Sequence, residues 1–304
     1  MAGETGTVES GLDTTALNLA VYYALRPGLI FDPMATVKPT KQSHVGAAVT
    51  FTKMNDMAIS VTPLDEYTDV VAEVLTDAPL TVTLAEHGKA TISTAKLRGT
   101  SFVEFDPTAV NRLAYNAGRT IDLLAQTALS GEAASEYVVA ASPGNNLNST
   151  DLRNIKAQLE NANVEPFADG FYRAVVSPYQ SRDLRAESET AAAGWRAPHS
   201  YAQPGEIFRG EIGEYEGFRF IVNSTLIAGT EANTRRALFV GQEALAKAFS
   251  KRAGFGPFPS VRPGPVTDKL MRFRPLGWYW LGAYKCFRPE AVVWADFQHL
   301  AVAV

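Results

Sequence analysis

Four glutamates close together are the residues of this chain that could do acid/base chemistry. Glu206, Glu211, Glu214 and Glu216 lie in or just before the stretch GEIGEYEGFRFI, which spans residues 210–221. Carboxylate-based hydrolysis needs one protonated acid and one ionised acid, normally on different elements that face a cleft. These four acids crowd one short segment instead, so a hydrolase is kept only as an alternative interpretation.

A turn explains the same stretch more economically than a catalytic site. Gly210, Gly213 and Gly217 mark positions where the backbone can need a positive φ. Arg209 and Arg219 flank the acids and could neutralise them locally. We therefore predict a charged hairpin tip that leads directly into an apolar strand.

Other residue types that could form a site are scattered along the chain. A zinc site needs three or four convergent ligands, and no two histidines stand at metal-ligand spacing. Cys286 lies in the aromatic run AYKCFRPE, where only Lys285 could lower the pKa of its thiol, so we expect a small buried hydrophobe. Phosphate-loop and nucleophile-elbow motifs are absent. The four histidines are His44, His87, His199 and His299. The sequence thus predicts that the chain is not an enzyme and has no catalytic, cofactor-binding or metal-binding residues.

The composition is that of an ordered globular chain. Of its 304 residues, 46% are hydrophobic and 20% are charged, and the net charge is −4. Without a long basic run, the chain does not resemble proteins that bind nucleic acid by neutralising many phosphates. A single cysteine suits a reducing compartment, and the apolar run over 16–25 is too short to span a membrane. We expect a soluble intracellular product with no membrane partner.

The first hundred residues read as extensions rather than as a core. Residues 1–50 form an expected arm, with a short amphipathic helix over 15–25 and then a segment broken by prolines and glycines. Alternating apolar residues over 80–84 predict a half-buried strand that continues after EHG. Residues 63–75 are ambiguous, because their apolar residues have helical spacing while their flanks read as one long hairpin.

The pattern over 107–129 predicts the clearest helix. Asp106 offers an N-cap oxygen, Pro107 suits the first helical position, and Gly131 follows the last turn. Its apolar stripe is rich in alanine, so whatever packs on it approaches closely.

The remainder alternates between helices and strands. We predict a linker over 141–150, a helix over 151–162 and a short helix over 242–251. The segment FYRAVVSPY reads as a buried strand that ends in a turn, and the last fifty residues return to strands. This order predicts an α+β chain in which a middle domain is inserted into an outer one.

The stretch FRGEIGEYEGFRFIVNSTL, residues 208–226, resembles the signature of tailed-phage major capsid proteins of the coliphage N-four type. The order around it is also similar. LRPGLIFDPMATVKPT resembles the N-terminal arm of that family, and DPTAVNRLAYNAGRTIDLLAQTAL resembles its spine helix. The resemblance covers roughly residues 15–300, and its most specific part is 210–219.

The resemblance implies a Hong Kong 97-type major capsid fold. The expected parts are an N-terminal arm at 1–50, an E-loop with flanking strands at 51–95, a P-domain at 96–145 with its spine helix at 107–129, an A-domain at about 146–255 and returning P-domain strands at 256–304. Lys53 and Lys89 flank the E-loop, but no motif pairs them with an asparagine, so no cross-link is predicted.

The same resemblance implies a structural role in a tailed double-stranded DNA phage. Copies would assemble into hexamers and pentamers of an icosahedral shell, made in the bacterial cytoplasm and found in the virion. The implied partners are other copies, portal, scaffold and decoration proteins, and enclosed DNA bound without sequence specificity. The alternatives are a shell-decorating or tail protein, or a hydrolase that uses the glutamates at 206–216.

Overall fold

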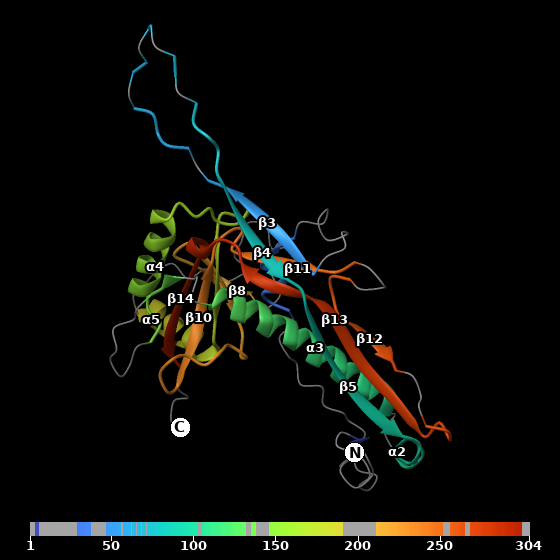
Figure 1. The fold of residues 1–304 in the computed structure, drawn as a ribbon. Helices are drawn as coiled ribbons and strands as arrows, with labels where there is room; N and C mark the ends of the chain where they lie inside the picture. Colours follow the sequence, from blue (N-terminus) through green and yellow to red (C-terminus); the bar gives the residue numbers. More distant parts are fainter. Residues whose placement is uncertain are drawn as a thin grey trace.

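The computed structural model gives an elongated molecule with a body at one end, a long sheet with one helix across it and a projecting hairpin (Figure 1). It describes residues 4–5, 29–37, 47–101 except 56, 62, 65, 68 and 71, and then 105–131, 135–137, 146–190, 211–251, 256–264 and 268–299.

The first sheet has six strands and runs along the length of the molecule. Its two long strands, β5 (Ala85–Thr94) and β13 (Phe273–Cys286), pair antiparallel over ten residues. The others flank this pair in the order β1-β5-β13-β11-β2, with β12 also on β13. Their bounds are β1 (Glu4–Thr5), β2 (Ala35–Thr36), β11 (Leu245–Phe249) and β12 (Ser260–Pro263).

One long helix, α3 (Phe105–Leu129), lies across this sheet after the short helix α2 (Ala95–Thr100). It begins two residues before the helix that the sequence predicts and ends at the same residue. Its small apolar face packs on the tryptophans of β13, and Trp278 Nε1 donates to Asn116 Oδ1 at 3.0 Å. The alanine-rich stripe therefore does allow close helix–sheet contact.

The second sheet forms the core of the body. Its six strands follow the order β6-β14-β10-β7-β9-β8, and helices α4 (Ser149–Asn161) and α5 (Pro178–Thr190) belong to the same body. Both β7 and β9 are central and buried, and they run parallel. The strand bounds are β6 (Ser135–Glu136), β7 (Tyr172–Val176), β8 (Glu211–Tyr215), β9 (Phe218–Val222), β10 (Thr234–Val240) and β14 (Val292–Gln298).

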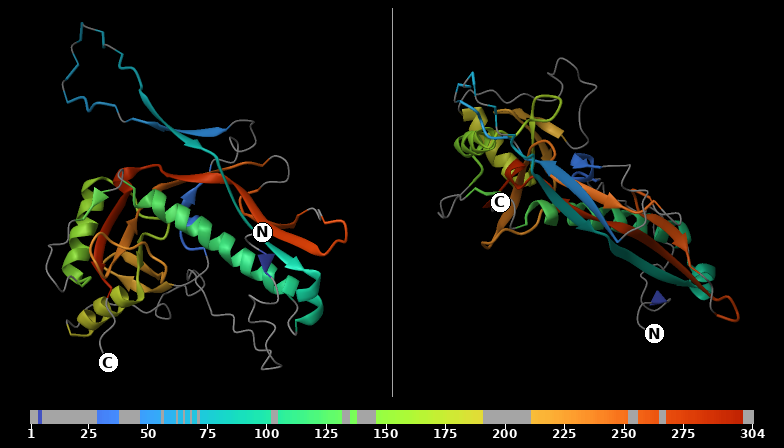
Figure 2. Two further views of the ribbon diagram at one scale, coloured as in Figure 1. Left: turned by 60° about the horizontal axis from the view of Figure 1, so that its bottom comes forward. Right: turned by 45° about the horizontal axis from the view of Figure 1, so that its top comes forward.

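A two-stranded hairpin of β3 (Ala48–Met54) and β4 (Asp77–Thr83) projects away from the rest of the molecule (Figure 2). Among the described residues of 63–75 there is no helix, only a turn at Glu66–Tyr67. The helical spacing of apolar residues there does not produce a helix, because a short helix needs tertiary packing of its apolar face and these side chains are exposed.

The helix predicted over 242–251 is wrong, since residues 245–249 form strand β11. Alanines at 244, 246 and 248 favour a helix locally. The segment instead has β13 on one side and β2 on the other, and its five residues are all buried. Strand pairing on both sides overrides the helix propensity.

The turn predicted after β7 is also wrong, because helix α5 begins at Pro178. Ser177 caps it: the Ser177 N–H donates to Gln180 Oε1 at 2.9 Å, and the Gln180 N–H donates to Ser177 Oγ at 3.3 Å. This reciprocal pair is a capping box with proline at the first helical position. The residues Ser-Pro-Tyr-Gln at 177–180 carry the signal for this helix start.

Two other predictions fall wholly or partly on residues that the structure does not describe. The helix expected over 15–25 lies outside them, as does the first half of the linker expected over 141–150. The second half of that linker enters α4 at Ser149, and Asn148 Oδ1 caps this helix by accepting the Asp151 N–H at 2.8 Å. The helix thus begins two residues earlier than predicted. It ends at Asn161.

Candidate functional site

Of the four glutamates that could do acid/base chemistry, the two whose side chains the structure describes, Glu214 and Glu216, each pair with an arginine and do not share a cleft. Glu216 and Gly217 form the tip of the β8–β9 hairpin, with φ values of 49° and 81°. Glu216 pairs with Arg153 on the surface at 3.0 Å. Glu206 and Gly210 lie outside the described residues, and of Glu211 only the backbone, in β8, is described. The predicted hairpin tip is therefore present.

Glu214 lies in β8 rather than at the hairpin tip, and it is only 6% exposed. Arg219 Nη2 donates to Glu214 Oε1 at 3.0 Å, and Arg219 Nη1 lies 2.7 Å from Asp169 Oδ2. Arg173 is buried next to them and contacts the same Asp169 oxygen at 2.8 Å. This arrangement is an internal network of two acids and two arginines, which suits stability and not proton transfer to a substrate. The prediction that Arg219 could neutralise the acids beside it is confirmed for Glu214, whereas Glu216 pairs with Arg153 and Arg209 lies outside the described residues.

Cys286 and the two described histidines make structural contacts within the fold. Burial raises the pKa of the Cys286 thiol to about 11, so the side chain stays protonated in the core. The ring of His87 stacks on Trp280, and His299 Nδ1 lies 3.0 Å from Ser177 Oγ. Within the described part of the chain, no three metal-ligating side chains come together. His44 and His199 lie outside it.

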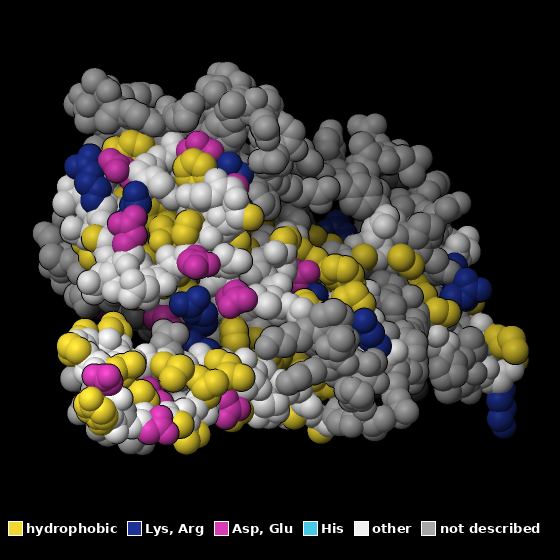
Figure 3. Space-filling model, turned by 90° about the horizontal axis from the view of Figure 1, so that it is seen from above, with side chains coloured by type: hydrophobic (Ala, Val, Ile, Leu, Met, Phe, Trp, Pro, Cys, Tyr) yellow, Lys and Arg dark blue, Asp and Glu magenta, His cyan; other side chains and the backbone are white. Residues whose placement is uncertain are grey.

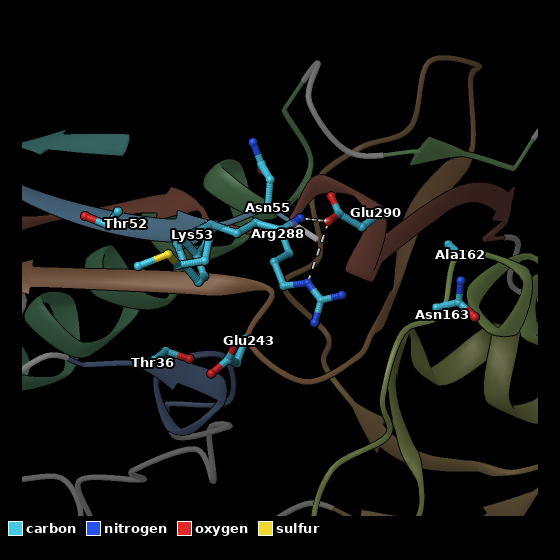
Figure 4. A pocket seen from close by; sticks show the side chains of 11 residues that line it. Thr36, Thr52, Lys53, Asn55, Ala162, Asn163, Glu243, Arg288 and Glu290 are labelled. Atoms are coloured by element: carbon cyan, nitrogen blue, oxygen red, sulfur yellow. Dashed lines mark hydrogen bonds and ion pairs between the residues drawn. The ribbon is translucent and has the colours of Figure 1, made fainter. Parts of the chain in front are cut away.

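A polar cavity of about 640 Å³ lies at the root of the projecting hairpin (Figure 4). Lys53 of β3 and Arg288 both reach Glu290, at the start of the short helix η5 (Pro289–Ala291). Burial alone would raise the pKa of Glu290, but hydrogen bonds from Lys53 and the local backbone lower it. The Glu290 carboxylate stays ionised. Its ion pair with Lys53 joins the root of the hairpin to the body at this cavity.

Apolar contacts hold the same root from the other side. Phe51 of β3 and Val82 of β4 are fully buried against β11, and the ring of Phe51 lies 6.0 Å from that of Phe287. The two strands therefore leave the body as a stiff unit rather than as a loose loop.

Beyond this root the large apolar side chains of the described part of the hairpin are exposed. Ile59 and Tyr67 are 89% and 90% exposed. Contiguous exposure of large apolar side chains marks a surface that a partner covers. The others in the described part of the hairpin are Met54, Met57, Val61, Leu64, Val70, Val74 and Leu75.

The described part of the N-terminal arm, residues 29–37, differs from the exposed hairpin because it packs on its own chain. We call residues 30–36 the arm root. Asp122 of α3 accepts the backbone N–H groups of Ile30 and Phe31 at 2.9 and 3.1 Å. Asp32, in the short helix η2 (Asp32–Met34), contacts both Lys247 and Tyr284. These contacts and the β2–β11 pairing fix residues 30–36 against the first sheet.

No helix of the described residues is long and apolar enough to cross a membrane. Residues 160–301 match the family model described as phage capsid protein. No curated protein matches the chain.

Solved structures match nearly the whole chain at low sequence identity. The capsid of Ralstonia phage GP4 is 16% identical, with a TM-score of 0.69 and 96% of each chain covered. The cyanophage Pam1 capsid asymmetric unit is 13% identical, with a TM-score of 0.67, and the match covers 98% of this chain and 99% of that one. A more distant match, at 10% identity and a TM-score of 0.54, is the holo-SrpI encapsulin complex from Synechococcus elongatus PCC 7942, with 90% of this chain and 89% of that one covered.

These likenesses identify the architecture described above. The matches span nearly the full length of this chain and of the capsid subunits. The family match adds that the second half of the chain carries phage capsid sequence features. The chain thus has the α+β Hong Kong 97-type capsid fold.

Proposed function

We propose that this chain is the major capsid protein of a tailed double-stranded DNA bacteriophage. Copies of it build the hexamers and pentamers of an icosahedral shell around the genome. The observation that carries the proposal is the projecting hairpin, whose root is fixed by charge pairs and buried phenylalanine while its far part exposes large apolar side chains. Such a surface gains stability only when another copy covers it.

The competing functions have less support. A carboxylate hydrolase needs acids that face a cleft, whereas Glu214 is buried against Arg219 and Glu216 pairs with Arg153. A decorating or tail protein is disfavoured by the match of nearly the whole chain to capsid subunits. The encapsulin match shares the fold, but the family match over 160–301 favours a phage capsid. We infer that the chain is not an enzyme.

Finer assignments belong to the same proposal. The stretch at 210–219 supports the coliphage N-four type of capsid protein. We expect portal, scaffold and decoration proteins as partners, DNA enclosed without sequence-specific contacts, assembly in the host cytoplasm and a final place in the virion. The five domain ranges expected from the sequence also stay a proposal, and the pairing of β11 with β13 favours a return to the P-domain near residue 245.

Purified full-length protein tests the main proposal directly. Light scattering and negative-stain electron microscopy at rising protein concentration should show large closed particles made of this chain alone. A compact monomer at every concentration and salt would contradict it. Small oligomers that attach only to a preformed shell would instead identify a decorating protein.

Replacing Ile59 with aspartate should raise the concentration needed for assembly by at least about tenfold. The substitution removes a large apolar contact and places a charge where a neighbour would bury it, each worth on the order of 1–3 kcal/mol. The side chain is 89% exposed, so the fold itself should be unaffected. Light scattering gives the threshold concentration, and circular dichroism checks the fold.

The neighbouring residue provides a matched control. Ser60→Asp adds the same charge to the same exposed segment but removes no apolar surface. It should assemble close to wild type. If Ile59→Asp and Ser60→Asp assemble alike, the apolar hairpin does not form the contact proposed here.

A further inference from the structure

The polar cavity at the root of the projecting hairpin brings two cations to a single acid. Lys53 of β3 and Arg288, between β13 and η5, both reach the carboxylate of Glu290. Cationic and acidic side chains lie next to one another where the hairpin meets the body (Figure 3). The three described side chains at this point therefore carry one more positive charge than negative charge.

Arg288 is the cation whose hydrogen bonds are not made. Its Nε lies 3.7 Å from Glu290 Oε1, which is beyond hydrogen-bond distance, and this nitrogen is buried without an acceptor. Within the described part of the chain, the guanidinium makes no other polar contact. Its side chain is only 20% exposed, so its N–H donors gain little from bulk water. An anion that enters the cavity would supply the acceptors that this guanidinium lacks.

The acids of the cavity do not provide those acceptors. Glu290 accepts the hydrogen bond of Lys53. Glu243 lies on another wall, and its carboxylate points toward Thr36 (Figure 4). Because Glu243 makes the formal charge of the whole cavity zero, an anion is favoured only on the Arg288 side. A ligand that extends to Glu243 has to donate a hydrogen bond to it, as a hydroxyl group does.

The rest of the lining suits a polar ligand of moderate size. The cavity volume of about 640 Å³ lies within the range of small-molecule sites. The side chains of Thr36, Thr52 and Asn163 face it from β2, β3 and the end of α4. Among the described residues none of these three side chains has a hydrogen-bond partner. They can therefore donate to or accept from a ligand with several hydroxyl groups.

We propose that this cavity binds a small phosphate ester with hydroxyl groups, of the sugar phosphate class. The phosphate accepts paired hydrogen bonds from the Arg288 guanidinium, whose planar fork matches phosphate geometry. The hydroxyl groups of the ligand extend toward Thr36 and Asn163, and one of them donates to Glu243. This binding function is separate from capsid assembly, although the bound molecule also joins β3 to the body.

Equilibrium dialysis with ribose 5-phosphate tests the proposal on full-length, unassembled protein. We expect saturable binding of one molecule per chain, with inorganic phosphate as a competitor. Ribose, which lacks the phosphate, should compete at least about tenfold more weakly, since a hydrogen bond between charged groups contributes at least about that factor. Arg288→Met should weaken the binding of ribose 5-phosphate by at least about tenfold for the same reason.

Asn163→Asp provides a second variant that leaves Arg288 in place. Aspartate, like asparagine, tolerates the left-handed backbone of this position, where φ is 52°. The added charge repels the phosphate, so binding at low salt should weaken by at least about threefold.

Two matched controls carry the same chemical changes away from the cavity. Asn233→Asp changes an exposed residue with a φ of 60° that does not line the cavity. Arg153→Met removes a surface arginine that also pairs with a glutamate, Glu216. Both should bind ribose 5-phosphate within about two-fold of wild type. Thermal unfolding of every variant checks that the fold is kept.

The contrary outcomes are distinct from one another. Unchanged binding in both Arg288→Met and Asn163→Asp would overturn the site, as would the absence of saturable binding to wild type. If wild type binds no ribose 5-phosphate while Arg288→Met raises the concentration needed for assembly, the guanidinium serves a carboxylate of another copy, and the proposal is also wrong. The dialysis does not require shells to form, so its result leaves the capsid function to its own test.

Discussion

Replacing Arg219 with methionine should lower the free energy of unfolding by about 3–5 kcal/mol. Arg219 is 5% exposed, and its guanidinium bridges Glu214 at 3.0 Å and Asp169 at 2.7 Å. Asp169 keeps Arg173 as a partner at 2.8 Å, but Glu214 is left as a buried charge beside an apolar chain. The large cost therefore comes from the orphaned Glu214 carboxylate.

Urea unfolding measures this cost best on protein that does not assemble, so the variant is made together with Ile59→Asp. Adding Glu214→Gln removes the orphaned charge and should recover a large part of the loss, since neighbouring substitutions in one network are not additive. The surface pair of Arg153 with Glu216 provides the contrast, and Arg153→Met should leave the unfolding midpoint unchanged. Equal effects of Arg219→Met and Arg153→Met would show that the buried network contributes nothing special.

The acidic segment shows how far the sequence predicts this site. Gly217 with the preceding glutamate predicts the turn, and Arg219 was expected to neutralise the acids beside it. The sequence does not predict the burial of Glu214, because the buried ion-pair network around it also needs Asp169. That residue lies fifty residues before Arg219. Local spacing finds turns, but it does not pair residues that only the tertiary fold brings together.

The helices and strands also fall into two groups: those that local sequence signals predict and those that depend on tertiary pairing. The helix over 107–129 has a continuous apolar stripe, so local signals are sufficient for most of its length. The predicted cap is wrong, because α3 begins at Phe105 and therefore contains both Asp106 and Pro107. Strand β11 has a helix-favouring composition and becomes a strand only because β13 and β2 pair with it. Its buried Lys247 is neutralised by Asp32, which is 215 residues away in the sequence. The exposed hairpin was predictable in outline from its local strand pattern, whereas the placing of its buried root depends on contacts with β11 and Phe287.

The arm root depends on one buried carboxylate, and Asp122→Ala should destabilise the protein by about 3 kcal/mol. Asp122 is 8% exposed; its Oδ1 accepts the Ile30 and Phe31 N–H groups, and its Oδ2 accepts from the Asn223 amide at 3.3 Å. Alanine leaves these donors without an acceptor, at a cost of about 1–3 kcal/mol for each fully buried group. Urea unfolding in the Ile59→Asp background measures the total. Hydrogen exchange should rise sharply in residues 29–36.

Asp122→Asn separates the hydrogen bonds from the charge. Its amide oxygen still accepts the two backbone N–H groups, so the arm root should stay protected. Burial raises the pKa of Asp122 more than the bonds from Phe31, Ile30 and Asn223 lower it. The folded chain holds this proton to higher pH than the unfolded chain, so the stability contributed by Asp122 is full below the ordinary aspartate pKa and falls as pH rises through the raised value. Asp122→Asn should lose that part of the pH dependence. If exchange in residues 29–36 is the same in Asp122→Ala and wild type, the arm root is held by its other contacts, at Asp32 and β11.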